Sequence, residues 1–422
     1  MIYNKTFPSG LRLVGETIEN AYGVSFGVMI DVGSVREETS ENGYSHFIEH
    51  MQFKGTEKRT SRDISEEMED IGADLNAYTS KDCTCYYTRT AADDLEKGVE
   101  MLSDMYFNAT FPDDELQREK KVVLEEISMN NDSPEDVSQD VIAEAVYKDQ
   151  KIGQTILGLV ENINNCDRHS ILEFKKKHYT PYTTVVSVAG KFDWQQVCML
   201  VEQYFESNFK GDYNTPDDEE YSKYSTCSLV VNKPVDQAHV SLAVGTGCGL
   251  GDTEQCAKLY LASAVLGGGL SSRLFQKIRE ERGLAYSVYS FLSEYKNSGY
   301  IEIYCGTNPD SVPECVDLLR DTIADFVNNG ITDKELKRAK AHVVTTLGFA
   351  SESSISRMRS NARQLIKLGK VLTVDETLAP YAKVTVEDVQ EVSKKLFSGK
   401  MASSYVGKKG KQSNCLKDFS IK

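Results

Sequence analysis

The chain has 422 residues, and its 48 Lys and Arg against 64 Asp and Glu give a net charge of −16. A single hydrophobic core seldom grows beyond about 300 residues, so this length predicts two domains. Nucleic acids and anionic membrane surfaces are bound by basic faces. An acidic chain is therefore not expected to have partners of either kind.

The sequence carries no sign of a membrane or secreted protein. No run approaches the roughly 18 apolar residues that span a bilayer, and the opening MIYNKTFPSGLRLVGETIEN contains no apolar signal core. The ten cysteines are scattered, without a CxxC pair. In a chain of this length such spacing is typical of reduced thiols, and we expect a cytoplasmic protein.

In the first half of the chain, alternating hydrophobicity predicts strands and a 3.6-residue period predicts helices. The expected strands are Gly10–Thr17, Gly23–Val32, Asp74–Thr79, Thr84–Thr90 and Thr184–Ala189. The expected helices are Ser45–Gly55, Arg62–Ile71, Asp93–Phe107, Pro112–Met129, Pro134–Tyr147, Arg168–His178 and Trp194–Phe205.

The segment Phe209–Thr226 is polar and acidic and has no apolar period. It predicts a linker at residues 211–226, between a first domain, 1–210, and a second, 227–422. After it the same kinds of element return. Strands are expected at Gln237–Gly245, Ala285–Phe291 and Gly299–Gly306, and helices at Thr253–Leu266, Pro309–Asn328 and Thr332–Leu347.

Two helices, one from each half of the chain, resemble each other at a constant offset. Glu115, Leu116 and Arg118 fall on Glu335, Leu336 and Arg338. The match predicts one α+β domain that has been duplicated, although two helices can share a short pattern by chance. At the same offset Glu119 and Glu126 fall on Ala339 and Thr346, so two carboxylates occur in the first copy only. This difference indicates that the first copy carries the chemistry.

Two of the six histidines stand in one motif, His46-Phe47-Ile48-Glu49-His50. Residues four apart lie on one face of a helix, so His46 and His50 can bind one ion. Neutral imidazole suits zinc, and a catalytic zinc site has three protein ligands. Glu49 lies beside them and can accept a proton from an attacking water. The alternative is two surface histidines on an amphipathic helix.

A third ligand must come from elsewhere, and helix Pro112–Met129 offers Glu119, Glu125 and Glu126. Glu119 and Glu126 are seven residues apart and differ by only about 20° around the helix, so they share a face. Glu125 points about 100° away and is expected in solvent. The pair on one face either meets the histidines or forms a solvated acidic surface.

With HFIEHMQFKGT and a later LEEI, which places Glu126 at the family's spacing from His50, the chain resembles the pitrilysin/insulinase family of zinc peptidases. It is most similar to the processing-peptidase subfamily, and HxxEH is the inverted form of the HExxH zinc motif. The resemblance implies that His46, His50 and Glu126 bind one zinc ion and that Glu49 is the general base. Glu119 would support the site from behind the ligands. The implied fold is α+β, with two homologous domains, each a mostly antiparallel sheet covered by helices.

Two further segments resemble the family. Asp74–Thr79 matches an edge strand to which an extended substrate adds, with Asn76 and Ala77 at the matching positions. Arg279 and Tyr286 match an Arg and a Tyr seven residues apart in the second half of relatives. The resemblance implies that Tyr286 donates to the oxyanion of the tetrahedral intermediate and that Arg279 holds the substrate main chain. Without the resemblance, each segment is typical of ordinary structure.

The sequence thus predicts a zinc metalloendopeptidase that cleaves short or unfolded peptides. Relatives enclose the substrate in a chamber of four such domains. A chain with two is therefore expected to form a homodimer, with Arg279 and Tyr286 acting on the partner's zinc site. Two alternatives remain open: a non-catalytic scaffold, and a catalytic subunit that needs a different partner chain.

Overall fold

The computed structural model of the chain describes residues 1–215, 221 and 223–421. The chain divides into two compact units, and each unit is assembled from three separate segments. Unit 1 consists of Met1–Ile127, Thr155–Asp218 and Leu347–Val374, and unit 2 consists of Ser128–Gln154, Glu219–Thr346 and Asp375–Lys422.

Unit 1 contains a six-stranded sheet in the order β1-β2-β6-β3-β5-β4 within the described residues. Its pairs are antiparallel except β2 with β6, which is parallel. The strands are β1 (Ile2–Thr6), β2 (Arg12–Thr17), β3 (Gly23–Ile30), β4 (Asp74–Thr79), β5 (Thr84–Ala91) and β6 (Thr184–Gly190). Strand β4 therefore forms one edge of this sheet.

Helices cover both faces of the first sheet. The main core lies on one face and includes Phe47 and Ile48 of α1 and Val201 of α8. A smaller core on the other face joins Met29 and Cys85 of the sheet to one helix, α12. The helices of unit 1 are α1 (Tyr44–Met51), α2 (Ser61–Glu69), α3 (Leu95–Asn108), most of α4 (Asp113–Asp132), α6 (Val160–Asn165), α7 (Arg168–His178), α8 (Trp194–Tyr204) and α12 (Ser354–Leu368).

Unit 2 contains a five-stranded sheet in the order β7-β11-β8-β10-β9 within the described residues. Its strands are β7 (Ser228–Asn232), β8 (Ala238–Gly245), β9 (Ala285–Glu294), β10 (Gly299–Thr307) and β11 (Ala402–Gly407). Its helices are α5 (Pro134–Tyr147), α9 (Thr253–Gly267), α10 (Val312–Asn329), most of α11 (Asp333–Ser351), α13 (Val374–Lys383) and α14 (Val386–Leu396), with a π-helical segment at Phe275–Glu280.

The predicted duplication is confirmed by the order of elements in both units. The strands β2-β6-β3-β5-β4 of the first sheet correspond to β7-β11-β8-β10-β9 of the second. In both orders the first two strands are parallel, and all other neighbouring strands are antiparallel. Helices α4 and α11 begin at Asp113 and Asp333, and α5 and α12 begin at Pro134 and Ser354. Both pairs keep the offset found in the sequence. The fold is the predicted α+β fold of two homologous domains.

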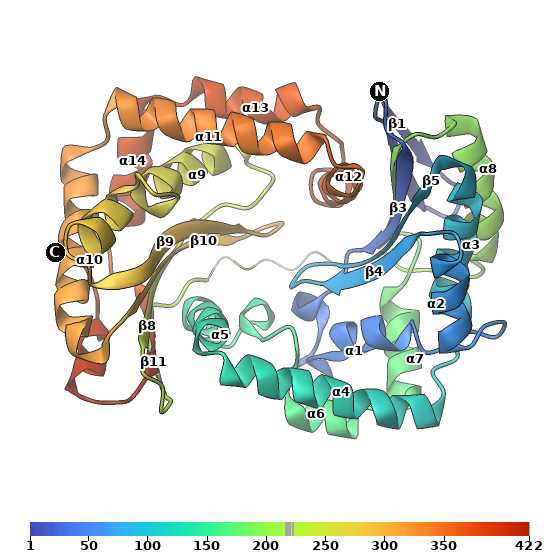
Figure 1. Cartoon of the computed structure of the whole chain (residues 1–422), viewed down its shortest axis with the longest axis horizontal. Coiled ribbons are helices and arrows are strands. Elements are labelled where there is room, and N and C mark those ends of the chain that lie inside the picture. Colours follow the sequence, from blue (N-terminus) through green and yellow to red (C-terminus); the bar gives the residue numbers. More distant parts are fainter. Residues whose placement is uncertain (216–220, 222, 422) are drawn as a thin grey trace. The chain divides into compact units, whose positions relative to one another are not determined.

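The two copies exchange a helix. Helix α5, from the first half of the sequence, packs on β8 and β11, whereas α12, from the second half, packs on β2, β3 and β6 (Figure 1). The units therefore differ from the predicted continuous ranges 1–210 and 227–422, because each apolar helix face covers the sheet of the other copy. The predicted linker, 211–226, lies partly outside the described residues.

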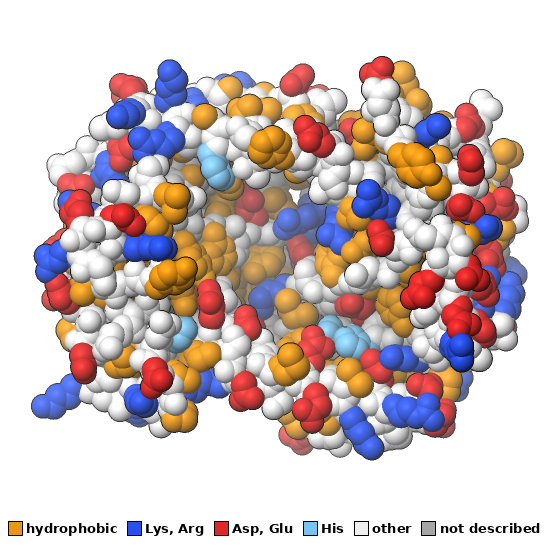
Figure 2. Space-filling model, in the orientation of Figure 1, with side chains coloured by type: hydrophobic (Ala, Val, Ile, Leu, Met, Phe, Trp, Pro, Cys, Tyr) orange, Lys and Arg blue, Asp and Glu red, His pale blue; other side chains and the backbone are white. Residues whose placement is uncertain are grey.

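The surface of the protein carries many charged side chains of both signs, as the composition of the chain predicts. On the face drawn in Figure 2, acidic and basic side chains are interspersed among polar and apolar ones. Among the described residues, the structure contains no helix with the length and apolar character needed to cross a membrane.

Candidate metal centre

Helix α1, which carries the HxxEH motif, is fixed at its start by a buried carboxylate. Glu37 accepts hydrogen bonds from the backbone N–H groups of Gly43 and Ser45, at 2.8 and 2.7 Å, and from the Asn42 side chain at 3.1 Å. Burial raises the pKa of Glu37, and these hydrogen bonds act against the rise. Gly43 adopts a φ of +102°, and a Cβ there would lie 2.8 Å from the Gly158 backbone. The chain therefore enters α1 along one fixed path.

The structure brings together the three predicted metal ligands. His46 Nε2 and His50 Nε2 lie 3.2 Å apart, and Glu126 Oε2 lies 3.6 and 3.5 Å from them. These residues form the one cluster of potential metal ligands among the described residues. Glu126 comes from α4, as predicted, and the neighbouring Glu125 is exposed.

Glu119, the predicted supporting carboxylate, lies behind His50. Glu119 Oε1 is 2.8 Å from His50 Nδ1, and its other oxygen forms an ion pair of 2.8 Å with Lys54. Glu119 is buried, which by itself raises its pKa, but the hydrogen bonds from His50 and Lys54 outweigh burial and lower it. Glu119 is therefore ionised and accepts the Nδ1 proton of His50, so that Nε2 is the ring nitrogen that faces the cluster.

The donor set fits a zinc ion. Zinc–nitrogen distances of about 2.0–2.1 Å imply that tetrahedral ligand atoms stand roughly 3.3 Å apart, close to the three observed spacings. Burial, with His50 nearby, lowers the pKa of His46 to about 3, so its ring is neutral and available as a ligand. Burial acts to lower the pKa of His50, but Glu119, Glu126 and Glu49 raise it overall, so the cluster attracts positive charge where the two ring nitrogens lie 3.2 Å apart. The chemistry of the three donors thus favours a divalent cation.

Glu49 lies close enough to His50 and Glu126 for their charges to act on its pKa, and it also contacts the edge of the sheet. Its Oε2 accepts a hydrogen bond of 2.5 Å from the hydroxyl of Thr79, the last residue of β4. Burial raises the pKa of Glu49, while the bond from Thr79 acts against the rise. The carboxylate that could act as a base therefore lies next to strand β4.

Strand β4 has a free edge, as predicted. It pairs with β5 alone among the described strands, and Asn76 and Ala77 lie in its middle. The N–H of Ala77 donates to the side-chain oxygen of Asn76 at 2.7 Å and not to a neighbouring strand. This leaves a main-chain donor on the free edge that an extended peptide could use after displacing the Asn76 side chain.

The predicted pair of the second half also comes together, within unit 2. The Arg279 guanidinium donates to the carbonyl oxygen of Tyr286 at 2.8 Å and stacks 4.6 Å from the centre of its ring. Tyr286 lies on β9 and its side chain is 75% exposed. The Arg279 side chain therefore contacts the strand that presents the exposed phenol of Tyr286.

Three supporting residues are absent from the sequence prediction: Glu37, Lys54 and Thr79. Glu37 precedes α1 in a segment without helical periodicity, so its capping role has no local signal. Lys54 follows the motif by only four residues and could have been proposed as the partner of a carboxylate. Thr79 ends the predicted strand, and its contact with Glu49 depends on how the strand and helix pack.

The chain belongs to the insulinase family of peptidases. Residues 12–159 match the profile of "Insulinase (Peptidase family M16)", and residues 165–343 match that of "Peptidase M16 inactive domain". An "uncharacterized zinc protease" of Bacillus subtilis is 36% identical over 97% of this chain and 99% of the relative. A protein of the same description from Streptomyces coelicolor is 34% identical over 98% of this chain and 91% of the relative.

Two solved structures share the fold. A protease from Helicobacter pylori matches with a TM-score of 0.88 and 23% identity, over 96% of this chain and 99% of the other. A structure from Pseudomonas fluorescens, described as a peptidase M16 inactive domain, matches with a TM-score of 0.89 and 20% identity, over 97% and 98%. Both likenesses extend over both units.

Proposed function

We propose that the protein is a zinc-dependent endopeptidase with its reactive centre at His46, His50 and Glu126. The observation that carries the proposal is the set of three donor atoms, 3.2 to 3.6 Å apart, with the carboxylate of Glu49 beside them. The relatives described as zinc proteases support the same interpretation. An ion held there would polarise the scissile carbonyl and lower the pKa of a water molecule.

The chain's own residues supply the proton transfers and the fit to the substrate. Glu49 accepts a proton from the attacking water and passes it to the leaving amine, and Thr79 holds its carboxylate in position. Glu119 fixes the ring of His50 by the bond at Nδ1. The Tyr286 hydroxyl donates to the oxyanion, and Arg279 holds the substrate main chain.

The substrate class we propose is short or unfolded peptides. A peptide that adds to the free edge of β4 is recognised through its main chain, which needs an extended segment and few particular side chains. Residues Asn76 and Ala77 lie at this edge. A folded protein does not offer such a segment, so it should resist cleavage.

We also propose that the protein acts as a homodimer in the cytoplasm, with Arg279 and Tyr286 of one protomer serving the zinc site of its partner. The ten cysteines are free, which suits a reducing compartment. The test mixes a Glu49→Gln chain with a Tyr286→Phe chain. Activity in the mixed dimer supports sharing across chains, and its absence in a mixture proven to exchange subunits contradicts it.

The first experiment is hydrolysis of internally quenched peptides by wild type and by Glu49→Gln, each with and without a chelator. We expect turnover by wild type that is lost in the variant and in the chelated samples. Glu49→Gln should still bind one zinc ion per chain, because Glu49 is not among the three ligands.

The same experiment separates the alternatives. A scaffold would hold no zinc at this site and cleave no peptide. A subunit that needs a different partner would hold zinc yet stay inactive alone, and its native mass would be the next measurement.

A further inference from the structure

The inner face of strands β4 and β5, on the side of α12, has a defined set of side chains. The cross-strand pairs are Asp74 with Arg89, Asn76 with Tyr87 and Tyr78 with Cys85. Cys85 and Tyr87 pack in the small core with α12, so their partners on β4 face the same side. A peptide added to β4 would present every second side chain to this face, at a spacing of roughly 6.6 Å.

A guanidinium from α12 reaches this face. Arg359 stacks 4.4 Å from the ring centre of Tyr87 and 4.9 Å from that of Tyr78. Tyr78 directly precedes Thr79, whose hydroxyl holds Glu49. The stacked cation therefore lies along β4 at the end next to the reactive centre.

Arg359 has no carboxylate partner within the part of the chain that the structure describes, and its Nε is buried without an acceptor. Its neighbour on the helix differs: Arg357 forms an ion pair of 2.8 Å with Glu16. A half-buried guanidinium normally finds a carboxylate, above all in a chain with 64 acidic residues. The stacking fixes Arg359 in place while its hydrogen-bond donors stay free for another acceptor.

The repeat shows that the scaffold does not need a cation here. At the offset that relates the two copies, Arg359 corresponds to Gln139 of α5, whose neutral amide donates to Glu302 of β10 at 3.2 Å. In unit 2 the side chain at this helix position is thus hydrogen-bonded to the sheet that the helix covers. In unit 1 the same position carries a guanidinium that contacts two tyrosine rings and has no carboxylate partner among the described residues.

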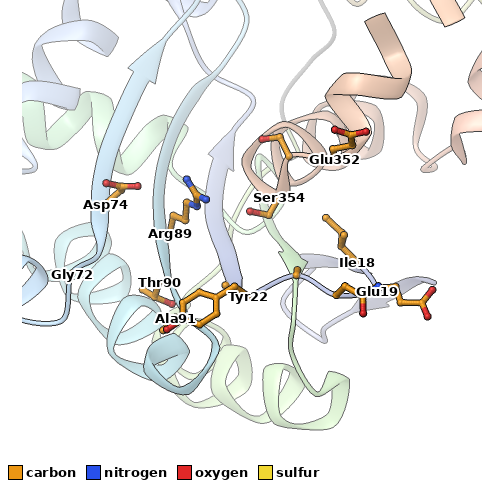
Figure 3. A pocket seen from close by; sticks show the side chains of 14 residues that line it. Ile18, Glu19, Tyr22, Gly72, Asp74, Arg89, Thr90, Ala91, Glu352 and Ser354 are labelled. Carbon is orange, nitrogen blue, oxygen red and sulfur yellow. The ribbon is translucent and has the colours of Figure 1, made fainter. Parts of the chain in front are cut away.

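A second guanidinium on this face has acidic residues in its surroundings. Arg89 lines a cavity of about 620 Å³ together with the carboxylate residues Glu19, Asp74 and Glu352 (Figure 3). With three carboxylates and one guanidinium in its lining, the cavity has a net negative charge. The two arginines therefore differ in their surroundings: Arg89 shares a cavity lining with acidic residues, whereas Arg359 lies against two tyrosine rings.

We infer that Arg359 forms a subsite for an acidic side chain of the bound peptide, beside Tyr78 on strand β4. This inference rests on the proposed peptidase function and adds to it a substrate class, peptides that carry Asp or Glu close to the cleaved bond. The carboxylate would accept hydrogen bonds from the guanidinium in a site that the two tyrosine rings partly shield from water.

The test uses quenched peptides that differ only by Glu or Gln at one position, scanned along both sides of the cleaved bond. For wild type we expect kcat/KM to favour Glu about tenfold at one position. In Arg359→Met, which keeps the aliphatic stem, this ratio should fall to near one. In Arg359→Glu the same position should favour Lys.

Two arginine variants serve as matched controls. Arg89→Met removes a cation from the other end of the same face, where the cavity lining is acidic, and Arg363→Met removes an exposed cation one turn further along α12. Both should keep most of the preference for Glu. Arg359→Lys should keep part of it, and it checks that loss in the Met variant is not a folding defect.

The outcomes separate this inference from the proposed function. Turnover with equal rates for Glu and Gln at every position contradicts the subsite and leaves the peptidase intact. A preference that survives in a folded Arg359→Met also contradicts it. If wild type cleaves no peptide at all, the proposed function and the subsite both fail.

Discussion

Glu119 Oε1 lies 2.8 Å from His50 Nδ1, which fixes which nitrogen of this ring faces the metal cluster. The carboxylate reaches this position because Glu119 and Glu126 share a face of α4, seven residues apart. One helix thus provides both a ligand and the group that orients another ligand. In α11, the second copy of this helix, the matching residues are Ala339 and Thr346.

We therefore expect Glu119→Gln to weaken zinc binding about 10- to 100-fold, because the amide no longer holds the His50 ring as a carboxylate does. Competition with a zinc chelator measures the affinity. Glu125→Gln is the matched control, since Glu125 is exposed on the same helix. Equal affinities in both variants would show that the contact does not orient His50.

We expect Tyr286→Phe to lower kcat/KM by about 10²- to 10³-fold, the usual effect of removing one oxyanion donor. Zinc content should not change, since the phenol is not part of the ligand cluster. Steady-state kinetics with one quenched peptide measures the loss. Tyr22→Phe, at another exposed tyrosine, should behave as wild type. A Tyr286→Phe enzyme with full activity would remove the phenol from the mechanism.

Helix α12 is held on the first sheet by a buried charge cluster, which predicts a stability effect. Lys367 forms ion pairs of 2.9 and 3.1 Å with Asp31 and Asp82. We expect Lys367→Met to lower the free energy of unfolding by about 3–5 kcal/mol, because buried Asp82 loses this cation and Asp31 loses one of its cations while it keeps Arg36 at 3.5 Å. Thermal and denaturant unfolding measure the loss, with exposed Lys370→Met as control. Similar stability in the two variants would contradict a structural role for Lys367.

Glu302, in unit 2, predicts a pH dependence of stability. The side chain is fully buried, and burial raises its pKa to about 8, against the hydrogen bonds from Ser241 and Gln139. From pH 4.5 to 8 the folded state keeps a proton that the unfolded chain releases. The contribution of Glu302 to the free energy of unfolding is therefore complete at low pH. It falls as the pH rises, by at most about 1.4 kcal/mol per pH unit.

The matched variant for that prediction is Glu302→Gln, which has a side chain of the same size but cannot ionise. We expect wild type and variant to differ little near pH 5, and the variant to be more stable above pH 8. Unfolding followed across this range gives the difference curve. Parallel curves would show that Glu302 ionises without cost in the folded protein.

Several elements could be predicted from the sequence with their observed ends: α5, α7 and β4 match the predicted ranges. Their apolar periods are regular and their first residues are good helix or strand starts. The three ligands could be predicted because the motif spacing and the helix period constrain them. Strands β1, β7 and β11 are short and have no clear alternation, so the sequence did not indicate them.

Other features depend on tertiary packing and leave no local trace. The apolar face of α12 is like that of any amphipathic helix, so nothing in it specifies which sheet it covers. Glu37 caps α1 from outside the helix, across a turn that depends on Gly43. Arg359 is one of many charged residues on helices, and only the structure shows that it has no carboxylate partner among the described residues.

The exchange of α5 and α12 has a consequence for the order in which the protein can be made. Synthesis proceeds from the N-terminus, and the first sheet waits for α12 until residue 368 of 422 has left the ribosome. The inner face of that sheet, with Met29 and Cys85, stays uncovered until then. A growing chain should therefore need protection from aggregation through most of its synthesis, and neither half, expressed alone, should fold into a stable unit.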